Sequence, residues 1–91
     1  MIISAAVRAV INGEKVIIPC HRHSNFFEIM KVLHCQYDKA SVEQGFIDWD
    51  NKKERFVSRA EAAQIALKCN QILPHMQADF NPNCCFSEDL W

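Results

Sequence analysis

The sequence predicts a small single domain of the α+β class, with an N-terminal antiparallel sheet and two α-helices. Its 91 residues are 49% hydrophobic and 23% charged, which excludes a disordered tail. Alternating apolar residues separated by short turns indicate strands, and two segments with apolar residues at helical spacing indicate helices. We expect one domain over residues 1–91, with the sheet in about 1–57, one helix at about 25–37, and a second helix at about 59–72 that precedes a docked tail.

The chain begins with a pattern typical of a β-hairpin. Residues 3–9 alternate between apolar and other positions, as in a strand with one buried face. Asn12-Gly13 tolerates the positive φ angles of a tight turn, and the β-branched residues 16–18 form the return strand. Pro19 lacks the N–H that a sheet ladder needs, so we expect this strand to end there.

The first helix follows a polar segment. Asn25 and Glu28 have the spacing of a capping box, which predicts a helix start. The predicted buried face consists of Phe26, Ile29, Met30, Leu33 and Tyr37.

A second hairpin and a second helix are predicted next. Residues 45–49 and 55–57 form the strands, joined by a polar turn. Ser58 and Glu61 form a second capping box. The predicted apolar stripe of this helix consists of Ala62, Ile65, Ala66, Cys69 and Ile72.

The tail, residues 75–91, is irregular but rich in apolar side chains. Each large side chain that becomes buried contributes about 1.5–3 kcal/mol, so we expect the tail to dock on the chain's own core or on another copy. The side chains concerned are Met76, Phe80, Phe86, Leu90 and Trp91.

Charge and composition bear on location and partners. The net charge of −1 argues against a long nucleic acid as partner. There is neither a basic leader nor an apolar segment of about 20 residues, so we expect no membrane partner and a cytoplasmic location. Five cysteines, an odd number, indicate reduced thiols.

Metal binding and catalysis are the less favoured interpretations. Cysteine and histidine cluster in the sequence, but adjacent pairs do not have the spacing of zinc ligands, so a zinc-stabilised domain remains only an alternative and we expect no metal. No catalytic motif is present, so we expect no enzyme, no catalytic residue and no cofactor. The residues considered for zinc are Cys20, His21, His23, His34 and Cys35.

Aromatic residues and arginines near a helix start indicate a ligand-binding site. Phe46 and Phe56 can stack on a base, and Arg22 and Arg59 can make bidentate contacts with phosphate. The N-terminus of the second helix adds unpaired N–H donors. We expect these four side chains to bind a small, phosphorylated molecule that contains a base.

The chain also resembles a family of small phage proteins, the first-described Thoeris anti-defence proteins or "sponges". The likeness extends from residue 2 to 91, and its most distinctive parts are residues 56–62 and the ending 87–91. The matching segments are Ser4-Ala5-Ala6-Val7-Arg8, Arg22-His23, Gln44-Gly45-Phe46, Phe56-Val57-Ser58-Arg59-Ala60-Glu61-Ala62 with Ala66, Asn70-Gln71-Ile72 and Ser87-Glu88-Asp89-Leu90-Trp91.

This resemblance implies a binding protein of an infecting phage. Such proteins hold a cyclic ADP-ribose isomer intact, and some also capture cyclic oligonucleotides, so the immune effector of the bacterial host receives no signal. It further implies homo-oligomers, dimers and in some members hexamers, with pockets between protomers, in the cytoplasm of the infected host. The alternative from a different class is a protein-interaction module that inhibits a host protein.

Overall fold

Four antiparallel strands form one sheet in the order β2-β1-β3-β4. The computed structural model describes all 91 residues. The strands are β1 (Ile2–Ile11), β2 (Glu14–Cys20), β3 (Glu43–Asp50) and β4 (Lys53–Ser58); the helices are α1 (Ser24–Leu33) and α2 (Arg59–Lys68). Three short 3₁₀-helices complete the chain: η1 (Lys39–Ser41), η2 (Pro74–Asp79) and η3 (Ser87–Asp89). The predicted α+β class is confirmed.

Tight turns close both hairpins. Asn12 and Gly13 have φ angles of 51° and 83°, as the sequence predicts, and Asn51 and Lys52 form the equivalent turn with 48° and 62°. The predicted end of the second strand is wrong, because β2 continues through Pro19, which pairs with Ala6. Since β2 lies at the edge of the sheet, a residue without an N–H is tolerated there.

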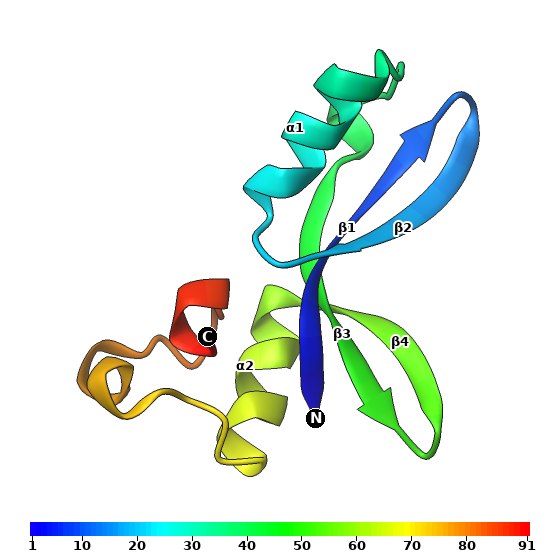
Figure 1. Cartoon of the computed structure of the whole chain (residues 1–91). Helices are drawn as coiled ribbons and strands as arrows, with labels where there is room; N and C mark the ends of the chain where they lie inside the picture. Colours follow the sequence, from blue (N-terminus) through cyan, green and yellow to red (C-terminus); the bar gives the residue numbers. More distant parts are fainter.

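Both helices cover the same face of the sheet. Figure 1 shows α1 beside the far end of β1 and α2 beside its start, with the C-terminal segment (red) between them. The covered face forms two core clusters, of which the one under α1 has four buried members. The larger one, under α2, comprises Ile2, Ala5, Phe46, Val57, Ala62, Ala63, Ala66, Ile72, Cys85 and Leu90.

The first helix is shorter than predicted. It ends at Leu33, because His34 adopts a left-handed conformation with φ 52°. Tyr37 therefore lies outside the helix, where it forms a bridge with Ile11 and packs against Phe26. The predicted burial of Ile29 and Leu33 is wrong, because both are exposed.

The predicted capping box of α1 is also wrong. His23 is the N-cap and makes no side-chain cap hydrogen bond. Asn25 instead accepts a hydrogen bond from the backbone N–H of Arg22 at 2.8 Å, which orders the turn before the helix.

The second helix begins where the sequence predicts but ends earlier. Ser58 Oγ accepts from the Glu61 N–H at 3.1 Å, while the Glu61 carboxylate accepts from Arg55 and does not complete the capping box. Asn70, with φ 55°, turns the chain away from the helix axis. Ile72 is buried outside the helix, and Cys69 is exposed, so the last turn of the predicted stripe is wrong.

The tail docks on α2 and on the sheet, which confirms one of the two predicted arrangements. The Cys85 N–H donates to the Arg59 carbonyl at 3.1 Å, and the Leu73 N–H donates to the Asp89 carbonyl at 2.8 Å. Leu90 is buried in the larger cluster, whereas Phe86 remains 45% exposed. Neither α1 nor α2 has the length or the apolar composition needed to cross a bilayer.

Candidate ligand-binding site

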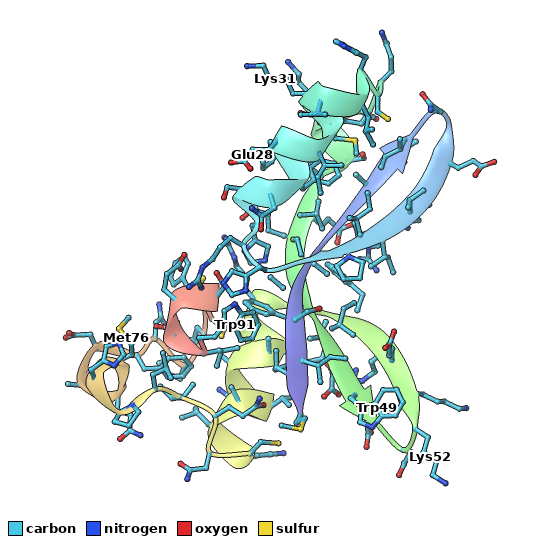
Figure 2. All side chains as sticks on the ribbon, in the orientation of Figure 1. Glu28, Lys31, Trp49, Lys52, Met76 and Trp91 are labelled. Atoms are coloured by element: carbon cyan, nitrogen blue, oxygen red, sulfur yellow. The ribbon has the colours of Figure 1, made fainter.

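Three of the four predicted site residues lie where α1 begins, α2 begins and the tail ends. We call this region the arginine junction and define it by Arg22, His23, Phe46, Arg59 and Trp91. Arg22 Nη2 donates to the Trp91 main-chain oxygen at 2.6 Å. The ring of Phe46 lies 5.2 Å from that of His23 and 6.3 Å from that of Trp91. In Figure 2, Trp91, the last residue of the tail, lies beside η3, between α2 and the sheet.

Local structure fixes the two arginines. Arg22 occupies the turn before α1, where Asn25 holds its backbone N–H. Arg59 is the first residue of α2, directly after the Ser58 cap, and its Nη2 donates to Gln44 Oε1 at 2.5 Å. The two helix starts therefore direct both guanidinium groups to the C-terminal segment, which lies between α1 and α2.

Both guanidinium groups have a buried donor without a partner. Arg22 Nη1 and Arg59 Nε are inaccessible to solvent and make no hydrogen bond. A buried unsatisfied donor costs about 1–3 kcal/mol, and more when it is charged. Each guanidinium group therefore keeps a hydrogen-bonding capacity that the single chain does not use.

An exposed aromatic ring lies beside Arg59. The guanidinium carbon of Arg59 is 5.1 Å from the centroid of the Phe86 ring, within the range of cation–π attraction. Phe46, by contrast, is fully buried and covered by its neighbours, so its ring has no free face. Phe86 is therefore an exposed aromatic side chain beside this junction.

His23 is a neutral, structural member of the junction. It is 8% exposed, and its Nε2 lies 2.7 Å from the Gly45 carbonyl oxygen. Burial lowers the pKa of His23, and the charge of Arg59 lowers it further, while the Gly45 carbonyl and Glu88 oppose the change. The positive charge of the junction therefore comes from the arginines.

Phe56 lies away from this junction, on the other face of the sheet. Its ring covers Gly45 so closely that a Cβ added at Gly45 would lie 2.5 Å from the ring. Arg8 stacks on the same ring, with its guanidinium carbon 4.5 Å from the ring centroid, and pairs with Glu43 at 2.6 Å. The structure therefore separates Phe56 from Arg22, Phe46 and Arg59.

None of the four cavities of the single chain contains a predicted site residue. One cavity, of about 270 Å³, lies between the end of α2 and η2 and is lined by Leu67, Asn70, Ile72, Gln77 and Phe80. The other three lie on α1, at the first hairpin turn and beside Met1. The chain's own tail fills the space next to the arginines.

Sequence patterns identify neither Trp91 as a member of the junction nor Phe86 and Gln44 as partners of Arg59. Trp91 is 69 positions from Arg22 along the chain, so no local spacing connects them. The one available signal is the apolar content of residues 86–91, which predicts docking but not its place. Gln44 lies two positions before the site residue Phe46, but nothing in the sequence marks it as the hydrogen-bond partner of Arg59.

The cysteines and histidines do not converge. No group of three or more His, Cys, Asp or Glu side chains is placed to hold a metal ion, so the zinc-stabilised alternative has no ligand set in this structure. All five cysteines are free thiols. Burial raises the pKa of the Cys85 thiol to about 12, and the nearby Asp89 contributes.

Comparison with known proteins identifies a family. A family model described as "Phage T4 y16D protein" matches residues 1–91. No curated protein and no solved structure matches the chain. The likeness to the Thoeris sponges stays a prediction, but its broader part, a phage protein, is confirmed. Since the match spans its whole length, the chain belongs to the phage T4 y16D protein family.

Proposed function

We propose that this phage protein binds a small cyclic nucleotide signal of the host's defence and retains it without cleavage. The ligand is a cyclic ADP-ribose isomer or a cyclic oligonucleotide. The protein acts as a homo-oligomer in the cytoplasm of the infected bacterium, where capture of the signal leaves the defence effector inactive.

The observation that carries this proposal is the pair of unsatisfied guanidinium donors. Arg22 Nη1 and Arg59 Nε are buried, charged and without an acceptor. Phosphate oxygens satisfy such donors with charge-assisted hydrogen bonds, about twice as strong as neutral ones. The exposed ring of Phe86 beside Arg59 adds a surface on which a base can stack.

The chemistry of the nearby groups supports retention without cleavage. The Cys85 thiol, with a pKa of about 12, is protonated at neutral pH and is a poor nucleophile. His23 is held neutral, and its Nε2 is engaged by the Gly45 carbonyl. These groups are suited to holding an anion in place more than to attacking it.

The filled junction supports a site that a second copy completes. A small nucleotide is enclosed in a pocket of about 300–1,000 Å³, and a 91-residue chain has little room for one of its own. Residues 86–91 lie at the junction, so a neighbouring copy that approaches there adds a wall to the site. Binding and assembly then stabilise each other.

A binding titration with arginine variants tests the proposal. Cyclic ADP-ribose isomers and cyclic dinucleotides are titrated into the wild type, Arg59→Ala and Arg8→Ala by calorimetry. Arg8→Ala is the matched control, because it removes an arginine that stacks on a phenylalanine on the opposite face of the sheet. We expect Arg59→Ala to weaken binding at least about tenfold, equivalent to 1.4 kcal/mol, and Arg8→Ala to leave it unchanged. Failure of every nucleotide to bind would overturn the proposal, and so would equal losses in both variants.

A further inference from the structure

A shallow apolar hollow lies on α1, on the side that faces away from the sheet. Its volume is about 330 Å³, and it is lined by Glu28, Ile29, Val32 and Leu33. Val32 is 74% exposed and Leu33 62%, the highest values among the large apolar side chains. Because these residues are three and four positions apart, they form one continuous surface, which we call the outer face of α1.

Unpaired charges of opposite sign border this surface. Figure 2 shows Glu28 and Lys31 on the same outward side of α1. Neither takes part in the four ion pairs of the chain, which involve Asp48, Glu43 and Glu61 as the acids. The outer face of α1 therefore offers an apolar centre with one acid towards the start of the helix and one base towards its end.

The arrangement is complementary to itself. If a second α1 lies antiparallel to the first, Glu28 of each copy approaches Lys31 of the partner subunit, and the apolar side chains meet at the centre. A parallel pair would bring like charges together. Contact of one patch with the same patch across a two-fold axis is the geometry of a symmetric dimer.

We infer that the outer face of α1 binds the same face of a second copy of this chain, in an antiparallel pair. A membrane surface is a poorer occupant, because attraction to anionic lipids needs a cluster of basic residues, and this face has one acid for each base. The inference goes beyond the proposed function, since this surface is separate from the arginine junction at which a second copy would complete the ligand site.

The size of the surface is typical of weak, reversible contacts. The ten residues of α1 span about 15 Å, so a pair of these helices buries an area at the low end of specific interfaces, below about 1,200 Å². We expect a reversible dimer with a dissociation constant of the order of micromolar.

Sedimentation without nucleotide tests this surface independently of ligand binding. Mass is measured from about 5 to about 500 µM for the wild type, Val32→Glu and Leu67→Glu. Leu67→Glu is the matched control, because Leu67 is an exposed leucine on α2. We expect the wild type and Leu67→Glu to double in mass with concentration, and Val32→Glu to remain monomeric with an unchanged circular dichroism spectrum.

Charge variants provide a second test that does not depend on Val32. Glu28→Lys and Lys31→Glu each place like charges across the pair, so each alone is expected to dimerise at least about tenfold more weakly. Mixed in equal amounts, the two variants have opposite charges and are expected to form a heterodimer.

Three results would overturn the inference. The first is a wild type that remains monomeric over the whole range, and the second is a dimer that Val32→Glu leaves intact. The third is a mixture of the charge variants that shows no more association than each alone. If nucleotide binds but the outer face of α1 does not pair, the proposed function stands and this inference fails.

Discussion

The two helices cover the same face of one sheet, but they are attached to it in different ways. α2 lies close to the strands, because its buried residues are alanines: Ala62, Ala63 and Ala66. α1 contacts the sheet through two large side chains, Phe26 and Met30. α2 is also covered by the tail, whereas no segment covers the outer face of α1.

This difference shows how a short chain distributes its apolar surface. A domain of this size buries only about 60–65% of the surface that its unfolded chain exposes. Here the last residues of the chain complete the region around α2 and fill the space beside Arg22 and Arg59. The region around α1 keeps an apolar surface for another molecule. Four predictions test the contrast.

The largest expected effect comes from the anchor of α1. Phe26→Ala removes a fully buried ring that packs edge-on against Phe27 and Tyr37. The cavity left behind should lower the free energy of unfolding by about 3–5 kcal/mol, as measured by urea denaturation. Phe27→Ala, at the neighbouring 39%-exposed position, should cost less than half as much. Equal losses would show that α1 is not anchored by Phe26.

The second prediction concerns the close approach of α2. Ala63→Leu introduces three extra carbons into a space that has no room for them, because Ala63 is completely buried. Overpacking should lower the free energy of unfolding by about 1–3 kcal/mol. Ala60→Leu, on the exposed side of the same helix, is the control and should be nearly neutral. A stable Ala63→Leu variant would contradict the alanine contact.

The third prediction compares the two helix starts. Ser58→Ala removes the hydroxyl that caps α2 and should cost about 1 kcal/mol in thermal or urea unfolding. Ser24→Ala, at the start of α1, removes a hydroxyl that caps nothing and should change stability by less than about 0.5 kcal/mol. The reverse order would show that α1 is the side-chain-capped helix.

The smallest expected effect is the titration of one group, His23. Because its pKa is lowered in the folded state, the unfolded chain binds a proton more readily below the ordinary value of 6.5. Stability should therefore fall as the pH decreases from 7 through 6.5 to the lower pKa of the folded state. His23→Gln should remove this part of the pH dependence, and His75→Gln, at an exposed position, should keep it. If the free energy of unfolding of His23→Gln fell with decreasing pH as steeply as that of the wild type, the pH dependence would come from other groups.

The strands and turns could be predicted because their signals are local. Asn12-Gly13 defines the first turn, and alternation identifies Ala5, Val7 and Ala9 as buried. Ile3, predicted on the same buried face, is 45% exposed, at the point where the pairing of β1 with β3 shifts between Ile2 and Ser4. The helix ends could not be predicted, because they depend on His34 and Asn70. Both residues have a left-handed backbone conformation, which is usually marked in a sequence by glycine. The sequence also gives no sign that Tyr37 lies outside the helix and forms an antiparallel backbone bridge with Ile11 of β1.

The candidate site could be predicted in part for the same reason. Arg22 lies just before α1, and Arg59 is the first residue of α2. Both positions can be inferred from the capping residues and the spacing of apolar residues. Phe56 could not be excluded from the candidate site by its sequence alone, because the face of the sheet to which its side chain points depends on the register of β3 and β4. Trp91 joins the site only when the chain returns over α2, a contact between distant residues without a local signature.

The most direct test of the central claim is the fate of the bound nucleotide. The protein is loaded with a cyclic ADP-ribose isomer, freed of excess ligand and denatured by heat, and the released molecule is identified by mass spectrometry. The account predicts recovery of the same isomer, chemically unchanged, in a fixed proportion to the protein. Recovery of a cleaved product, or of no nucleotide from this and from cyclic dinucleotides, would contradict it.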